Sequence, residues 1–377
     1  MRVVVDARPL SWGGYGGIKR VNVGLLEELS QDPRITAMSV MRGERVRKCW
    51  SRVVGVGQIT HALHGMKFMV WDVRREAKRF RADVVLSLSP EPVFCSCPVV
   101  MLFYDSYSLH QKSWLRSRDL LSWPYWFHWG RAKLRVHRAR SMDAVVLISE
   151  AAGVDVLPVL GRRGVASVVA HPGVAGSLYV GECMKHTSSV GRPGSGNQDH
   201  GFFLYFGAVN RHKNIQTLVE GFRRYREDLG GRCELVICGG VNWPVFDVSI
   251  FDRYTWVQWL GNVSDEELRM LLSHCIASVN VSFAEGFGLP VLEAMSCGKP
   301  VIVGRTGAFI EVVGDGGIFV DPFSAKEIAD ALLSLDIDAA ERRRLGILAK
   351  ARAESFSWSV MSDKVVSMLC SVVGPIS

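Results

Sequence analysis

The sequence predicts an α/β protein built from two doubly wound domains, each with a parallel sheet covered by helices on both faces. Short β-branched apolar runs alternate with amphipathic stretches in both halves of the 377-residue chain, a pattern typical of strands that are buried on both faces. A stretch rich in Gly, Ser, Asn and Pro (186–201) separates the halves and lacks periodicity. We therefore expect two domains that face a central cleft.

The N-terminal half contains one clear helix and six apolar runs. Apolar residues recur at helical spacing within 18–30. The predicted strands of this half are 3–7, 35–40, 83–89, 98–105, 143–149 and 166–172.

The alternation restarts after the polar stretch. The predicted strands here are 202–209, 234–240, 256–261, 276–282, 300–304 and 317–322, and the predicted helices are 214–229, 265–274, 289–297 and 324–335. We expect an N-terminal domain (1–185), a linker (186–200) and a C-terminal domain (201–356). We expect the terminal helix, within 357–377, to pack back on the N-terminal domain.

Composition favours a soluble cytosolic protein. Apolar residues make up 48% and charged residues 22% of the chain, and no run of about eighteen apolar residues predicts a membrane span. The N-terminus reads as a first strand and lacks the apolar core of a signal peptide. Nine cysteines are scattered along the chain, and Cys95-Ser96-Cys97 has the wrong spacing for a zinc pair. We expect reduced thiols.

The charge is divided unevenly between the halves. Residues 1–170 carry a balance of +12 and residues 171–377 a balance of −4, within a net charge of +8. The asymmetry suggests that the N-terminal half meets a membrane surface, a phosphate-bearing substrate or nucleic acid. An ordinary solvated basic surface is the alternative.

A basic cluster, GAVNRHKN (207–214), follows the first predicted strand of the second domain. Arg211, His212 and Lys213 crowd the start of a helix for which Asn214 is the expected N-cap. Cations oppose the helix dipole there, by about 0.3–1 kcal/mol each when exposed. A bound anion would reverse that sign and use the free amides. The cluster therefore predicts a phosphate site, with a solvated basic turn as the alternative.

A glycine turn, AEGFGLPVLEAMSCGKPVI (284–302), joins a predicted strand to a helix. Gly286 and Gly288 allow close approach of the backbone to a ligand, and Pro290 suits the first turn of a helix. Amides at 287–289 would face an anion. Glu285 and Glu293 flank this turn, and we expect Glu293 to point toward the cleft. Sugar and ribose hydroxyls are natural donors to such carboxylates, although both could simply favour a helix start.

These segments carry a family resemblance. The E-x7-E pair of Glu285 and Glu293, the upstream YFGAVNRHKN and the N-terminal DARPLSWGGYGGIKRVNVGLLEEL together resemble the retaining, nucleotide-sugar-dependent glycosyltransferases of family 4. The resemblance extends to bacterial mannosyltransferases of surface polysaccharide synthesis and covers nearly the whole chain. It implies the GT-B architecture, in which two Rossmann-like doubly wound domains face a cleft.

The resemblance also implies residue roles. Glu285 would hold hydroxyls of the donor sugar, and Glu293 would bind the ribose. The backbone from Gly286 through Phe287 and Gly288 to Leu289, with Lys213 and an arginine, would bind the diphosphate. Val263 would lie near the base, and Gly16 and Gly17 would approach the donor phosphate from the N-terminal domain.

The sequence departs from the family pattern in two places. The usual Arg-Lys-Asn is His212-Lys213-Asn214 here, with Arg211 one residue earlier, so either Arg211 or His212 could fill the arginine's role. Tyr104-Asp105 replaces a His-Asp pair found in many members, with His110 nearby. These three residues are the candidates for the acceptor side.

The expected reaction needs neither a metal nor another cofactor. Cations and amides can stabilise the charge that develops on a departing diphosphate. The one Asp-x-Asp triplet, Asp336-Ile337-Asp338, lies between two C-terminal helices and is expected to be structural. The resemblance implies a retaining reaction with no obligatory protein nucleophile, in which the departing phosphate takes the acceptor proton.

A basic, tryptophan-rich segment spans 112–140. It holds Trp114, Trp123, Trp126 and Trp129 among eight Lys and Arg residues. This composition suits an anionic membrane surface or lipid carrier, with an ordinary core-facing amphipathic helix as the alternative. No nucleic-acid fold signature accompanies it, so no nucleic-acid partner is expected.

The sequence thus predicts a retaining hexosyltransferase at the inner face of the cytoplasmic membrane. Its donor would be a nucleotide sugar, with GDP-mannose or a deoxy relative as the first guess by resemblance. Its acceptor would be a lipid-linked or oligosaccharide glycan of an O-antigen, capsule or exopolysaccharide. The alternatives are a phosphorylase or sugar-nucleotide epimerase on the same fold, and a non-catalytic protein that binds membranes or nucleic acid.

Overall fold

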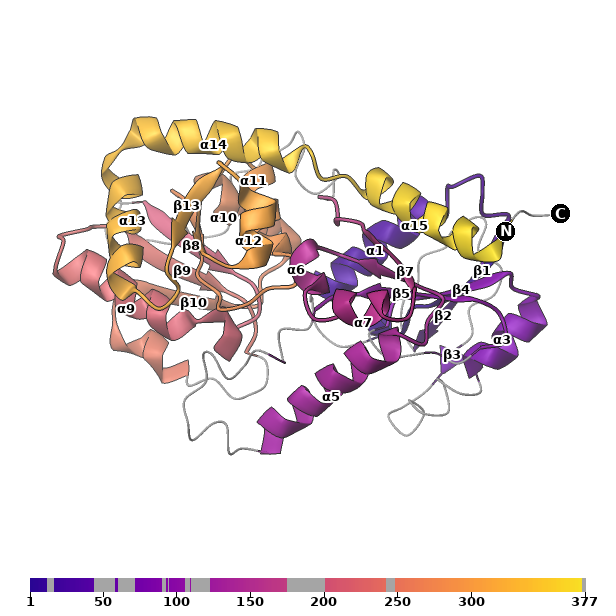
Figure 1. Cartoon of the computed structure of the whole chain (residues 1–377). Coiled ribbons are helices and arrows are strands. Elements are labelled where there is room, and N and C mark those ends of the chain that lie inside the picture. The colour runs from indigo at the N-terminus through magenta and orange to yellow at the C-terminus, as the bar shows by residue number, and fades with distance from the viewer. Residues whose placement is uncertain are drawn as a thin grey trace. The chain divides into compact units, whose positions relative to one another are not determined.

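The computed structural model divides the chain into two compact units. Unit 1 comprises Met1–Gly173 and Ser357–Ser377, and unit 2 comprises Val174–Phe356 (Figure 1). The structure describes residues 1–11, 17–43, 58–59, 72–89, 93, 95–105, 109, 123–174, 201–241 and 248–374. The predicted boundary at 185 and the predicted linker 186–200 lie outside these residues.

Unit 1 is built on a seven-stranded sheet with the order β3-β2-β1-β4-β5-β6-β7, in which every pair of neighbours is parallel. The strands are β1 (Arg2–Asp6), β2 (Ala37–Gly43), β3 (Gln58–Ile59), β4 (Val84–Ser87), β5 (Val99–Phe103), β6 (Ala144–Leu147) and β7 (Ala166–Val169). The helical segments are η1 (Arg8–Ser11), α1 (Gly17–Leu29), α3 (Val73–Phe80), α5 (Trp123–Ala139), α6 (Glu150–Gly153), α7 (Leu157–Gly161) and α15 (Trp358–Val373).

Helix α15 packs against α1 and the strands β4, β6 and β7 of unit 1. The approach is close, because a Cβ on Gly24 of α1 would lie 2.5 Å from the indole of Trp358. Met361, Val365 and Leu369 are fully buried at helical spacing. The end of the chain therefore completes the core of the unit in which the chain begins.

Unit 2 has a six-stranded parallel sheet with the order β10-β9-β8-β11-β12-β13. Its strands are β8 (Phe202–Phe206), β9 (Glu234–Cys238), β10 (Val257–Gly261), β11 (Ser278–Asn280), β12 (Val301–Gly304) and β13 (Gly317–Val320). Its helical segments are η5 (Arg211–Lys213), α9 (Ile215–Glu227), η6 (Val248–Arg253), α10 (Asp265–His274), α11 (Leu289–Ser296), α12 (Gly307–Val313), α13 (Ala325–Ile337) and α14 (Ala339–Ala353).

The strand order of unit 2 reverses between β8 and β11. The chain runs from β8 outward to β9 and β10, then returns to the other side of β8 for β11. The crevice at the carboxyl ends of such neighbouring strands is where doubly wound domains bind ligands. The loops that follow β8 and β11 are therefore the first place to look for a site in this unit.

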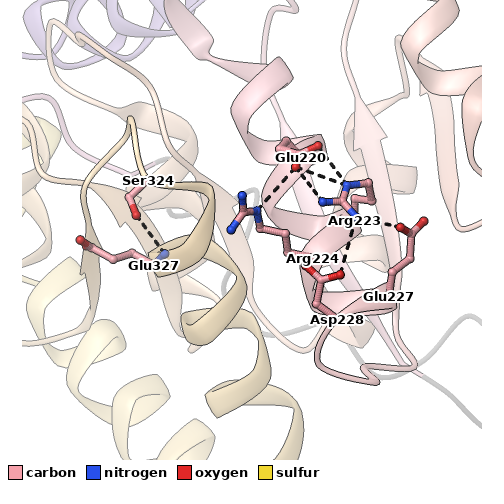
Figure 2. A network of polar contacts seen from close by, with 7 residues as sticks. All are labelled: Glu220, Arg223, Arg224, Glu227, Asp228, Ser324 and Glu327. Carbon is pink, nitrogen blue, oxygen red and sulfur yellow. Dashed lines mark hydrogen bonds and ion pairs between the residues drawn. The ribbon is translucent and has the colours of Figure 1, made fainter.

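Helix α9, which follows the β8 loop, is held mainly by packing against α13. A Cβ on Gly221 of α9 would lie 2.6 Å from Ile328 of α13, so the two backbones approach closely at this point. Figure 2 shows Arg223 and Arg224 bonded to carboxylates on the outer face of α9, and Ser324 bonded to Glu327 at the start of α13. The ion pairs of Arg223 and Arg224 lie near the surface and contribute roughly 0–1 kcal/mol each.

The Asp-x-Asp triplet is structural, as predicted. Asp336 accepts hydrogen bonds from the Tyr225 hydroxyl and the Cys233 thiol. Asp338 caps α14, since its Oδ1 accepts from the Glu341 amide at 2.9 Å. Both carboxylates thus hold helices in place.

One stretch, Ala339–Val373, is long and apolar enough to cross a membrane by composition alone. It comprises α14 and α15, which are separate helices that belong to different units. Each buries an apolar face in its own unit, through Leu345 and Ala349 in α14 and Val365 and Leu369 in α15. This is weak evidence for a span, because core helices pass the same test.

Candidate active site

The candidate site of unit 2 lies where the loops after β8 and β11 meet. The first loop passes through Gly207 and η5 into α9, and the second passes through Glu285 into α11. The two loops are directly bonded, because the Phe283 amide donates to the His212 carbonyl at 2.8 Å. The geometry therefore brings together two segments that the sequence separates by about seventy residues.

Asn214 holds the first loop, but in a different way from that expected. It adopts a left-handed conformation (φ 58°) before α9, and its side chain makes no capping hydrogen bond. Its Nδ2 instead donates to the carbonyls of Val281 (2.9 Å) and Pro322 (2.6 Å), and its Oδ1 accepts from the Thr217 hydroxyl. Asn214 is thus the N-cap residue of α9, as predicted, but its side-chain amide ties this turn to the chain beyond β11 and β13 and does not cap the helix.

A buried ion pair joins the two loops. Lys213 Nζ lies 2.6 and 2.8 Å from the two carboxylate oxygens of Glu285, and the side chains are only 12% and 9% exposed. The Ser282 hydroxyl lies 2.7 Å from Glu285 Oε1. Burying either charge alone would be costly, so each residue compensates the other.

Ser282 was missed by the sequence analysis. Its hydroxyl lies within reach of both Asn280 Oδ1 and Glu285 Oε1, at 2.7 Å in each case. The available signal was a serine three residues before the first glutamate of the E-x7-E pair. Tyr205 was also missed. Burial, and then the nearby charge of the Glu285 carboxylate, raises the pKa of the Tyr205 hydroxyl.

The glycine turn that leads into α11 depends on Gly288. This residue is the N-cap of α11, with φ at 104°, and a Cβ there would lie 2.8 Å from the Phe309 ring. The position therefore requires glycine for both conformation and space. Helix α11 begins at Leu289, with Pro290 in its first turn.

The residues around Gly288 differ in exposure. Phe287 is 3% exposed and packs edge-on against Phe356, with ring centroids 5.7 Å apart. Leu289 is buried at 7%, and Gly286 is half-buried. The side chains of Phe287 and Leu289 thus belong to the core, which leaves the backbone as the part of this turn that a ligand could use.

Glu293 lies one turn further along α11. It is 5% exposed, so its carboxylate lies inside the unit. Its main-chain carbonyl accepts from the Ser296 hydroxyl at 2.7 Å. Glu293 lies on α11, and Glu285 lies just before the glycine turn that starts this helix. The turn therefore sets where the two carboxylates lie relative to each other.

His212 and Arg211 lie together in η5, each half-buried as a whole residue. Burial of the imidazole, and then the charge of Lys213, lowers the pKa of His212 well below its usual value. His212 is therefore neutral at pH 7.

Val263 is half-buried in the loop between β10 and α10. This loop lies at the same edge of the sheet as the loops after β8 and β9, because all these strands are parallel. A Cβ on Gly240, after β9, would lie 2.9 Å from Asn262. The loops after β9 and β10 are therefore in contact beside the candidate site.

The candidate residues of unit 1 fall on its own sheet edge. Gly17 is exposed at the start of α1, whereas Gly16 and His110 lie outside the described residues. Tyr104 is buried, and its hydroxyl contacts Asn22 Oδ1 and the Leu88 carbonyl. The Tyr104 side chain thus packs inside unit 1. Burial raises the pKa of its phenol. Asp105, the next residue, is half-buried.

Unit 1 also has a charged group at its own strand reversal, between β1 and β4. The Asp6 carboxylate is fully buried at the end of β1 and bonded by the Arg8 guanidinium at 2.7 Å. Ser87 of β4 contacts the same carboxylate. Within the described part of the chain, no three His, Cys, Asp or Glu side chains group closely enough to hold a metal ion.

Part of the chain matches a known family. Residues 192–352, less than half of the chain, match the family of glycosyl transferases group 1. Over the whole chain, the structure is similar to solved GT-B glycosyltransferases. WaaG, a glycosyltransferase of lipopolysaccharide biosynthesis, gives a TM-score of 0.72 at 15% identity and 98% coverage of this chain, with 99% of WaaG covered. HepE of Anabaena, in complex with UDP-glucose, gives 0.73 at 17% identity, with 98% and 100% of the chains covered. The predicted GT-B fold is confirmed.

Two relatives of known name match part of the sequence. The O-antigen chain mannosyltransferase B of Escherichia coli is 34% identical over 172 residues, which cover 44% of this chain and 45% of that protein. The O-antigen chain mannosyltransferase RfbU of Salmonella typhimurium is 31% identical over 141 residues, covering 36% and 38%. The matched part therefore spans less than half the length of these relatives.

The ion pair predicts a measurable coupling between residues 213 and 285. Lys213→Met should lower the free energy of unfolding by about 3 kcal/mol, because it leaves a buried carboxylate without its cation. The double variant Lys213→Met/Glu285→Gln should lose at least about 1 kcal/mol less than the sum of the single variants. Urea denaturation measures both.

The control for this cycle is Arg223→Ala on the outer face of α9, which breaks exposed pairs and should cost less than about 1 kcal/mol. Additive effects of Lys213→Met and Glu285→Gln would show that the two side chains are not paired in solution.

Proposed function

We propose that the protein is a retaining glycosyltransferase that moves a hexose from a nucleotide sugar to a lipid-linked or oligosaccharide acceptor in bacterial surface glycan synthesis. The observation that carries the proposal is the Lys213–Glu285–Ser282 cluster at the strand reversal of unit 2, beside the start of α11. The family match of residues 192–352 supports the same reaction class.

The donor diphosphate would bind at the start of α11. The first amides of a helix are unsatisfied and carry partial positive charge, so they suit an anion. The Lys213 ammonium has three N–H groups and donates to the two carboxylate oxygens of Glu285, at 2.6 and 2.8 Å. Its third N–H group can bind the diphosphate while the ion pair stays in place. Arg211 is the cation that we assign to the family's arginine, because His212 is neutral.

The two glutamates would divide the hydroxyls of the donor between them. Glu285 would accept from the transferred sugar, as Lys213 and Ser282 leave lone pairs of its carboxylate available. Glu293 would accept from the ribose. Both would act by orientation and charge, and neither is assigned as a general acid.

In the proposed reaction, the bond between the sugar anomeric carbon and the diphosphate oxygen breaks, and a bond to the acceptor oxygen forms on the same face. The acceptor proton passes to the departing phosphate. Preorganised amides and cations that stabilise developing charge are worth several kcal/mol in such sites. No metal or other cofactor is invoked.

A GDP-sugar, with mannose as the first choice, is the proposed donor. Three relatives of 31–34% identity are named as mannosyltransferases, and this is the support for mannose. The HepE structures contain UDP or UDP-glucose. The test below therefore includes both guanosine and uridine nucleotides.

Helix α5 is the proposed contact with the membrane. It buries Ala132, Val136 and Ala139 on one face, while Trp126 and Leu134 are each 47% exposed. Lys133 lies over the Trp129 ring, 5.2 Å from its centroid. An exposed face that combines indoles with cations suits an interface with anionic lipids. The N-terminal end of α5 is the end farther from the sheet of unit 1 (Figure 1), and residues 112–122 of the basic segment lie outside the described residues.

Donor class is tested with a panel of nucleoside diphosphates and nucleotide sugars. A ligand at about 100 times its Kd adds about 2.7 kcal/mol of stability, so the cognate nucleotide should raise the melting temperature by about 5 °C or more. One sugar nucleotide should also be consumed when a lipid-linked acceptor is added. If no nucleotide shifts melting and no donor is turned over, the chain is not a transferase of this class; a pyridoxal chromophore would favour a phosphorylase.

The roles of the two glutamates predict different defects. Glu285→Gln should lower the transfer rate by about 100-fold or more while nucleotide affinity stays within about threefold, because the lost interaction is with the sugar. Glu293→Gln should weaken nucleotide binding by about tenfold, since it removes a charged acceptor for ribose hydroxyls. Calorimetry and initial rates measure the two effects. Equal defects of both variants in both assays would refute the division of roles.

The membrane proposal predicts a selective loss of lipid binding. The variant Trp126→Ala/Lys133→Glu should bind vesicles containing phosphatidylglycerol at least about tenfold more weakly, because each charge near the surface is worth about 1 kcal/mol. Co-sedimentation measures the bound fraction. Ile347→Ala/Lys350→Glu, which changes an exposed pair on α14 of unit 2, is the control. Equal binding by both double variants would exclude α5 as the membrane contact.

A further inference from the structure

Two thiols lie in contact in the connection between β4 and β5 of unit 1. The Sγ atoms of Cys95 and Cys97 are 3.1 Å apart, and both residues are half-buried. Cys233, Cys238 and Cys275 of unit 2 are buried. The 95/97 pair is therefore a dithiol that small reagents can reach, and the proposed transferase reaction does not use it.

The segment that carries the pair is anchored at both ends. Val93 is 1% exposed and packs in the core of unit 1, against which Cys95 and Cys97 also lie. Beyond the pair, the Pro98 carbonyl accepts from the Val85 amide at 2.9 Å, and the Val99 amide donates to Asp143 Oδ2 at 2.7 Å. The fixed ends keep the two thiols close.

The two thiols are not equivalent. The hydrogen bond from Cys97, helped by the amides of Cys97 and Ser96, lowers the pKa of Cys95 to about 6. The same bond, with burial and the negative charges of Cys95 and Asp143, raises the pKa of Cys97. These opposite pKa shifts favour Cys95 as the thiolate and Cys97 as the neighbouring thiol. A thiolate beside a second thiol is the arrangement of a reactive cysteine with a resolving partner.

We propose that Cys95 and Cys97 form a reversible dithiol–disulfide pair that reacts with low-molecular-weight disulfides such as oxidised glutathione. Cys95 attacks one sulfur of the reagent, forming a mixed disulfide and releasing one glutathione thiolate. Cys97 then loses its proton and attacks Cys95 Sγ, which releases the second glutathione. Starting from the Cys95 thiolate and the Cys97 thiol, the protein loses two electrons and one proton, and the reagent takes up that proton and one from solvent to leave as two thiols. A ring closed over one intervening residue is strained, so glutathione would reduce it readily.

The test uses the native full-length protein with oxidised glutathione, followed by acid quenching, alkylation, tryptic digestion and mass spectrometry. Both cysteines fall in one tryptic peptide, 82–112, which contains no other cysteine. We expect this peptide to lose two hydrogen atoms and to escape alkylation.

In Cys97→Ser, the same peptide should instead carry one glutathione, because the mixed disulfide is not resolved. The half-buried Cys297 and Cys370 are internal controls and should react more slowly.

Two outcomes would overturn the proposal. One is a wild-type 82–112 peptide that stays reduced while Cys297 or Cys370 is modified. The other is a Cys97→Ser protein that does not accumulate glutathione at residue 95. The pH at which Cys95 reaches half its maximal alkylation rate is a separate readout that needs no variant. It should lie near pH 6, and a value at the usual thiol pKa of about 8.5 would show that Cys97 does not activate Cys95.

Discussion

The ion pair between Lys213 and Glu285 is the interaction on which the organisation of the candidate site depends. It joins the loops after β8 and β11, the two strands between which the order of the sheet reverses. Both side chains are nearly buried, so each loop is held in a position that keeps the other charge compensated. The Asn214 amide reinforces this by binding the carbonyls of Val281 and Pro322.

The pair also suits the proposed binding of a charged ligand. While no nucleotide sugar is bound, a largely buried lysine without a partner would be poorly tolerated. A largely buried glutamate without a partner would be equally unfavourable. Paired, they keep the site close to neutral and still retain one N–H group and several lone pairs for new bonds. Such preorganised groups do not have to reorient when charge develops on a leaving group.

Parts of the architecture could be predicted because local sequence determines them. The runs FFLYF and ELVIC read as strands of a covered parallel sheet, and both are buried strands. The edge strand β3 has only two residues, and the short helix α12 has seven. Neither was predicted, since periodicity needs a longer window to be recognised.

The sequence by itself determined the two doubly wound domains, the glycine turn before α11 and the residue types of an anion and hydroxyl site. These follow from β-branched runs, from the glycines at 286 and 288, and from residue types that lie within a few positions of one another. Only the tertiary structure decided that Lys213 bonds Glu285, that the Asn214 amide bonds the carbonyls of Val281 and Pro322 instead of a helix amide, and that His212 is neutral. The physical reason is that each of these depends on burial and on partners distant in the chain, which local periodicity does not encode.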